Sequence, residues 1–201
     1  MNKLLPYALL ISAFAAFPHV TFAQPNVGTE MQDAMKALGM LMGGGGGATN
    51  QVVHQRQLRD LLPTEFEGMR RSNTEAGKNA AFGMNISYAQ GTYAKDNQTI
   101  TVKLSDISAM GEFMKIAQYA WAQQEMERES DDGYERTTKI QGFSAQETFE
   151  NTYKSGSINV MVDGRFVVEA ESSGVDMDKV KKLLTTINLK KLAELKPDPN
   201  Y

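Results

Sequence analysis

The sequence predicts an α+β fold: an antiparallel sheet of about six or seven strands packed by two helices, with a tethered N-terminal amphipathic helix. Three observations predict it. Segments that alternate apolar and polar residues, typical of half-buried strands, follow one another between residues 67 and 172. The connections between them are short, which requires antiparallel pairing. Two segments with apolar residues at helical spacing can cover one face of such a sheet.

The N-terminal segment has the three parts of a secretory signal peptide. Lys3 supplies a positive charge, Leu4 to Phe17 are mostly apolar, and Thr21-Phe22-Ala23 places small residues before a cleavage site. This pattern predicts that residues 1–23 are removed on export. The apolar run is shorter than the roughly 20 residues of a membrane-spanning helix, and the chain has no cysteine for a lipid anchor. We therefore expect a soluble periplasmic protein that is not lipidated and has no membrane span once mature.

Residues 24–47 are predicted to form a Met-rich helix and a glycine tether. Met31, Met35, Leu38 and Met42 recur at helical spacing and form an apolar stripe. Gly43 to Gly47 cannot hold a helix and predict a flexible connector. Exposing the stripe to water costs roughly 25 cal/mol for each Å². We therefore expect these four side chains to contact a partner or ligand.

The remaining elements belong to a single α+β domain at residues 48–196, followed by a flexible tail at residues 197–201. A polar helix is expected from Asn50 to Leu62, because Pro63 disfavours helix before it. Strands are expected at Gly68–Asn73, Met84–Tyr93, Thr99–Leu104, Tyr134–Ile140, Phe143–Tyr153, Ile158–Val162 and Phe166–Ala170. Helices are expected at Ser108–Glu129 and Asp176–Leu192. Asp163-Gly164 predicts a type I′ hairpin turn, in which both residues need positive φ.

Composition excludes several kinds of site. Without cysteine there is no disulfide, thiol nucleophile or cysteine-based metal centre. A formal charge of −3 with no basic cluster argues against nucleic acid as a partner. His54 is the only histidine after export, and no nucleophile-elbow motif is present. The sequence therefore predicts no catalytic residue and no cofactor.

Three groups of residues have both a functional and a structural interpretation. The first is an acidic run, which we interpret as a solvated helix end and turn because acids two residues apart point to different helix faces. It comprises Glu125, Glu127, Glu129, Asp131, Asp132 and Glu135. Tyr119, Trp121 and Tyr134 could line a ligand surface, but a core role is favoured for Trp121. The methionines near the mature N-terminus are soft ligands suited to Cu(I), although the same residues fit an apolar packing stripe. No metal site is predicted.

Several stretches carry a resemblance to known proteins. Gly133–Thr138, Val162–Val168, Gly174–Asp178 and Leu61-Leu62-Pro63 resemble a family of uncharacterised exported proteins of Gram-negative bacteria, over roughly Leu58 to Leu192. The family has no established activity, so the resemblance implies no functional residues. The element order is similar to that of the PsbP, Mog1 and DcrB-like proteins, which implies an accessory or binding role by analogy of fold alone.

These observations favour an exported, non-enzymatic binding or accessory protein of the cell envelope. Its partner would be an apolar small molecule or an envelope protein, and self-association through the stripe is an alternative. A hydrolase-like enzyme that uses carboxylates and a Cu(I) carrier that uses the Met-rich segment remain as alternative functions.

Overall fold

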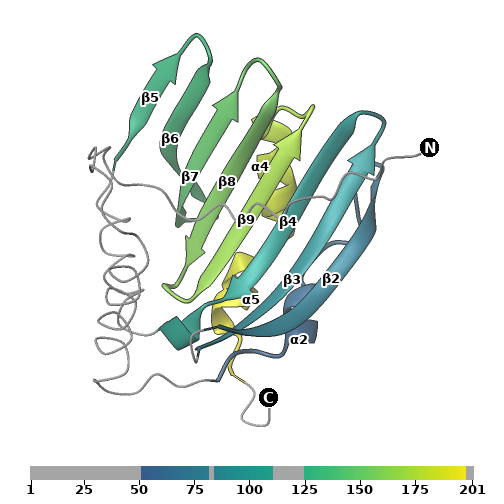
Figure 1. The fold of residues 1–201 in the computed structure, drawn as a ribbon, viewed down its shortest axis with the longest axis vertical. Helices are drawn as coiled ribbons and strands as arrows, with labels where there is room; N and C mark the ends of the chain where they lie inside the picture. Colours follow the sequence, from purple (N-terminus) through teal and green to yellow (C-terminus); the bar gives the residue numbers. More distant parts are fainter. Residues whose placement is uncertain (1–50, 82–83, 111–124, 198–201) are drawn as a thin grey trace, which may run out of the picture. The chain divides into compact units, whose positions relative to one another are not determined.

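Nine β-strands form one antiparallel sheet in the computed structural model, which describes residues 51–81, 84–110 and 125–197. All of these residues belong to one unit. The strands lie side by side in the order β1-β2-β3-β4-β9-β8-β7-β6-β5. Figure 1 labels β2 to β9 of this order. Their bounds are β1 Glu65–Phe66, β2 Met69–Ala81, β3 Met84–Lys95, β4 Gln98–Asp106, β5 Glu127–Ser130, β6 Gly133–Ile140, β7 Phe143–Glu150, β8 Ser155–Val162 and β9 Phe166–Ser173.

The sheet consists of two meanders, in which strands that follow one another in the chain also pair. β1 to β4 form the first meander and β5 to β9 the second. β4 and β9 pair from Thr99↔Ser173 to Asp106↔Phe166 and join the two meanders into one sheet. The predicted antiparallel arrangement is confirmed.

The predicted number of six or seven strands is wrong, because two short strands carry no readable alternation. β1 has only two residues, and all four residues of β5 are exposed. β5 also occupies the end of the helix that was predicted at Ser108–Glu129. The start of that helix is a short 3-10 helix, η1, at Ser108–Met110, and residues 111–124 lie outside the described residues.

The described part of the chain contains three α-helices: α2 at Gln55–Arg59, α4 at Met177–Thr186 and α5 at Leu189–Glu194. The C-terminal helix predicted at Asp176–Leu192 is therefore divided. Its backbone becomes extended at Ile187, and the Asn188 side chain then caps α5 by accepting a hydrogen bond from Lys191 N at 2.8 Å. Asparagine favours such caps over helix interiors. The N-terminal helix predicted within residues 24–47 lies outside the described residues.

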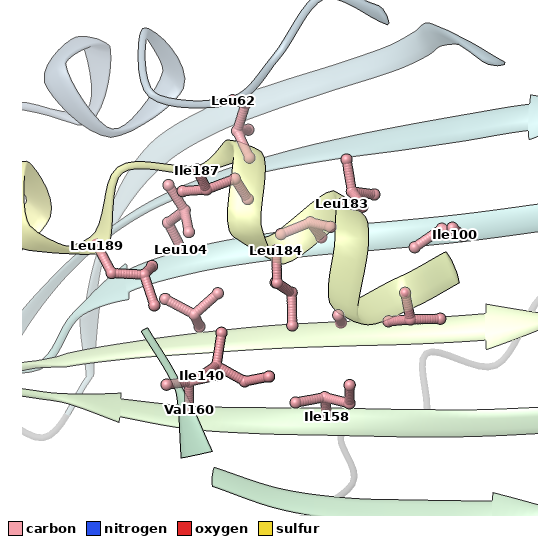
Figure 2. Close-up of a cluster of buried hydrophobic side chains, with 14 of the residues drawn as sticks. Leu62, Ile100, Leu104, Ile140, Ile158, Val160, Leu183, Leu184, Ile187 and Leu189 are labelled. Carbon is pink, nitrogen blue, oxygen red and sulfur yellow. The ribbon is translucent and has the colours of Figure 1, made fainter. Parts of the chain in front are cut away.

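The helices share one hydrophobic core with one face of the sheet. One row of this face crosses five strands and consists of Ala89, Leu104, Val168, Val160 and Ala145, all nearly fully buried. Leu183 and Leu184 of α4 reach toward the strands from above (Figure 2). Because close-packed side chains fill this layer, the alternation read from the sequence corresponds to burial against the helices.

The opposite face of the sheet is polar. The hydroxyls of Thr92 and Thr101 lie 3.2 Å apart on neighbouring strands, and Lys103 pairs with Glu169 at 3.3 Å. A separate small apolar cluster consists of Ile107, Met161 and Val167. This division between a packed and a polar face is typical of antiparallel sheets.

Three hairpin turns of the described chain place consecutive residues at positive φ, one of them at Glu67 and Gly68 between β1 and β2. Asp163 and Gly164 have φ of 51° and 62°, which confirms the turn predicted there. Gln141 and Gly142 have φ of 51° and 90° in the turn between β6 and β7. A glutamine at positive φ is uncommon because this backbone conformation is strained for residues other than glycine. We therefore expect its side chain to make contacts that offset the strain.

The side chain of Gln141 closes the junction between α4 and α5. Its Nε2 donates to Leu184 O at 2.9 Å and to Ile187 O at 2.6 Å. Its Oε1 accepts from Leu189 N at 3.4 Å. The amide thus bonds the carbonyls at the end of α4 and the first N–H of α5, where helix ends leave backbone groups in need of partners. Leu184 O also accepts from Ile187 N at 3.3 Å.

Replacing Gln141 with alanine is expected to lower the free energy of unfolding by about 1–3 kcal/mol, because partly buried backbone groups lose their bonds. Gln141→Gly loses the same bonds but relieves the positive φ, so its loss is expected to be smaller. Urea denaturation of both variants measures the difference. An alanine variant as stable as the wild type would contradict this role of the amide.

Candidate functional site

Two carboxylates on the helix-covered face, Asp106 and Glu147, are completely buried. A charge removed from water must be paired and hydrogen-bonded to be tolerated. The partners of each carboxylate therefore indicate what it does. The two have different surroundings.

Asp106 joins three parts of the chain. Its carboxylate accepts hydrogen bonds from Val53 N at 2.8 Å and Ser108 N at 3.0 Å. Arg165 donates to it from Nε at 3.3 Å and from Nη2 at 2.8 Å. Arg165 also donates from Nη1 to Leu195 O at 2.6 Å. Four donors occupy the carboxylate, so Asp106 anchors the first described residues, the end of β4 and the turn between β8 and β9.

Glu147, on β7, is surrounded by three donor side chains, and we call these four residues the Glu147 cluster. Tyr134 Oη donates to its Oε1 at 2.6 Å. Arg136 donates to Oε2 at 3.2 Å and to Oε1 at 3.0 Å. Lys181 of α4 places its Nζ 2.9 Å from Oε2. The cluster therefore bonds α4 to β6 and β7.

The bonds within the cluster set its protonation states. Burial acts to raise the pKa of Glu147, but hydrogen bonds from Arg136, Tyr134 and Lys181 together lower it. Burial, followed by the hydrogen bond to Glu147, raises the pKa of Tyr134 to about 12. The hydrogen bond to Glu147 raises the pKa of Arg136. At neutral pH the cluster is thus an ionised carboxylate held by a neutral phenol and two cations.

An open hollow of about 450 Å³ adjoins this cluster at the β5–β6 end of the sheet. It is lined by residues 125–127 and 136–139, and we call it the edge hollow. Arg136 lines the hollow and binds Glu147, so it connects the two features. Glu125 and Glu127 add two exposed acidic residues to the wall.

This arrangement is suited to holding elements in place rather than to transferring protons. A general acid works best when its pKa lies near the working pH. Glu147 has a lowered pKa and Tyr134 a raised one, so both are shifted away from neutral pH. The Glu147 cluster therefore does not favour the alternative of a carboxylate hydrolase.

The predicted contact residues Met31, Met35, Leu38 and Met42 lie outside the described residues, as do Tyr119 and Trp121. His54 is the N-cap of α2, where its Nδ1 accepts from Arg56 N at 3.2 Å. Tyr134 packs against Phe149 with ring centroids 5.8 Å apart. Its hydroxyl belongs to the Glu147 cluster, so the partly buried Tyr134 helps to hold β6 against β7.

The acidic run was predicted as a solvated helix end and turn; the turn is confirmed, but the residues that flank it lie on strands. Glu127 and Glu129 lie on strand β5, Asp131 and Asp132 form the turn, and Glu135 lies on β6. The first four acids are spaced by two residues, which is the period of a strand. The structure thus gathers Glu127, Glu129 and Glu135 on two paired strands at the end of the described sheet.

Sequence reasoning missed Asp106, Glu147 and their partners, although a signal was present. Ile100, Val102 and Leu104 alternate on one face of β4, and Asp106 continues that series. On β7, Glu147 falls two residues after buried Ala145. A charged residue at a buried position of an alternating strand predicts a paired charge. The partners Arg165 and Lys181 are distant in the chain and could not be read from spacing. Arg136, in contrast, lies directly opposite Glu147 across the turn between β6 and β7, so the register of these two predicted strands could have identified it.

Within the described ranges, no group of three or more His, Asp or Glu side chains is placed to hold a metal ion. None of the helices described is long and apolar enough to cross a membrane. Comparison of the chain with family models, curated proteins and solved structures found no match.

Proposed function

We propose that this chain is an exported binding or accessory protein of the cell envelope, and that its Met-rich helix captures a protein partner. The observation that carries the proposal is the apolar stripe of Met31, Met35, Leu38 and Met42, joined to the domain by five glycines. Exposing an apolar stripe of this kind to water raises the free energy, and burying it against a partner lowers the free energy. Methionine adapts its shape to irregular apolar surfaces, as promiscuous binding surfaces require.

The described domain supports a protein partner over a small apolar ligand. Sites for small apolar ligands are concave and lined mainly by apolar side chains. The core between helices and sheet is filled by its own side chains (Figure 2). The edge hollow, in contrast, is lined mostly by charged and polar residues. A protein surface needs no internal cavity, so it suits the stripe better.

The test compares two sets of substitutions in the full-length exported protein. Met35→Asp with Leu38→Asp places charges on the stripe, whereas Gln32→Asp with Lys36→Asp places them off it. Partner capture in the periplasm, measured by in-cell crosslinking and native mass spectrometry, is expected to be lost only in the first variant. Equal capture by both variants would refute the proposal.

A third variant separates apolar packing from Cu(I) binding. Met31→Leu, Met35→Leu and Met42→Leu together keep the stripe apolar but remove its thioethers. The proposal expects partner capture to persist in this triple variant. Loss of capture together with loss of Cu(I) binding in titration would favour the copper carrier instead.

A further inference from the structure

We propose that strand β5 is a docking edge for an extended segment of a partner that carries lysine or arginine side chains. The proposal concerns a different surface from the Met-rich helix and does not depend on it. Among the described strands, β5 pairs only with β6 and ends the sheet (Figure 1). The outward side of an edge strand presents main-chain groups that can pair with an added strand.

The register of β5 identifies which main-chain groups face outward. Thr137 N donates to Met126 O at 2.7 Å, which makes these two residues a hydrogen-bonded pair. Pairs in an antiparallel ladder alternate between bonded and non-bonded. Glu127↔Arg136 and Glu129↔Tyr134 are therefore non-bonded pairs. The main-chain N–H and C=O groups of Glu127 and Glu129 point away from β6.

The charge around this edge determines the chemistry of the occupant. Glu125 and Glu127 line the edge hollow, and no ion pair joins either of them to another described residue. The wall also carries two cations: Arg136, which is bonded to buried Glu147, and Lys139, which is exposed. The hollow is thus a recess beside the edge in which a basic side chain finds carboxylates. Pockets of this kind give strand addition its side-chain specificity.

A second copy of the chain is a poor occupant. Antiparallel pairing of β5 with itself would bring Glu127 and Glu129 close to the same residues of the other copy, and like charges across strands repel. Charged residues on an edge strand also disfavour its nonspecific pairing with strands of other chains. The same charges admit a complementary segment, so the edge favours a basic extended partner.

The test uses a blocked probe peptide, Thr-Lys-Val-Lys-Val-Thr, whose lysines lie on one face when extended, and the matching peptide with glutamate in place of lysine. Nuclear magnetic resonance titration of the mature protein follows its backbone amides. We expect the lysine peptide to shift the amides of Glu127 and Glu129 and the glutamate peptide to shift neither. Glu129→Pro removes an outward N–H without removing a β5–β6 bond. This variant is expected to bind the lysine peptide about tenfold more weakly.

A second variant keeps the backbone intact and tests the charges alone. Glu125→Gln with Glu127→Gln is expected to weaken binding about three- to tenfold and to reduce its salt dependence. Glu171→Gln, an exposed acid on β9, is the control and should bind like the wild type. Shifts confined to other strands, equal binding of both peptides, or no binding of millimolar lysine peptide would each overturn the proposal. Deleting residues 29–47 should leave probe binding unchanged, which separates this outcome from that of the Met-rich helix.

Discussion

Replacing Asp106 with alanine is expected to lower the free energy of unfolding by about 3–5 kcal/mol, the largest effect of any single substitution considered. The variant leaves the Arg165 guanidinium, whose side chain is only 20% exposed, without its carboxylate. It also leaves Val53 N and Ser108 N without their acceptor. Each such buried group adds its own desolvation cost. Urea unfolding followed by circular dichroism measures the loss.

Two comparisons make this result specific. Asp163→Asn removes an exposed acid from the neighbouring turn and should change stability by less than about 0.5 kcal/mol. The double variant Asp106→Leu with Arg165→Met removes both charges. It should therefore recover much of the lost free energy of unfolding, because an unpaired buried charge destabilises the fold more than the absence of both charges. A double variant no more stable than Asp106→Ala would show that the ion pair is not the cause.

Replacing Glu147 with glutamine is expected to cost about 2–4 kcal/mol at neutral pH, since the ionised carboxylate is what Arg136 and Lys181 bind. The folded pKa of Glu147 lies below its ordinary value of 4.5. A carboxylate whose pKa is lowered by folding stabilises the fold at pH values above its ordinary pKa. This stabilisation is lost as the pH falls through the pKa of the folded state. The difference in free energy of unfolding between the wild type and Glu147→Gln should therefore become smaller as the solution becomes acidic.

Urea unfolding of both proteins between about pH 7 and about pH 3 tests this dependence. Glu171→Gln serves as the control, because its carboxylate is exposed and should follow the wild type across the range. A gap of constant size at every pH would mean that glutamine disturbs the packing beneath α4 rather than the charge. A stability difference that grows in acid would contradict the lowered pKa of Glu147.

Alternation in the sequence predicted those strands that bury every second residue over a readable length. Val160 and Val162, for example, follow Ile158 on the buried face of β8, and the turn at Asp163-Gly164 has the predicted positive φ. β1 is too short to show a period, and β5 buries nothing. A strand that is held only by its neighbour's backbone leaves no hydrophobic pattern to read. That is why the strand count was too low and the acids before the turn at Asp131-Asp132 were assigned to a helix end.

The candidate site was less accessible to prediction than the fold. The contact residues proposed from sequence, Met31 to Met42, lie outside the described residues, and their role stays a prediction. Glu147 and Lys181 come from a strand and a helix that are far apart in the chain, so no spacing rule links them. The edge hollow likewise depends on how β5 meets β6. Features made by tertiary pairing leave only a weak trace in one sequence.

The pairing of β4 with β9 also bears on how the chain reaches its folded state. All other described strand pairs join neighbours in the chain, so each closes a short loop at low entropic cost. Asp106 and Arg165, at the end of the β4–β9 ladder, are 59 residues apart. Non-local contacts slow folding because the chain loses entropy in closing a long loop before these contacts can form and stabilise it. We infer that the two meanders form as separate local units and that the β4–β9 ladder is the late step that makes them cooperate.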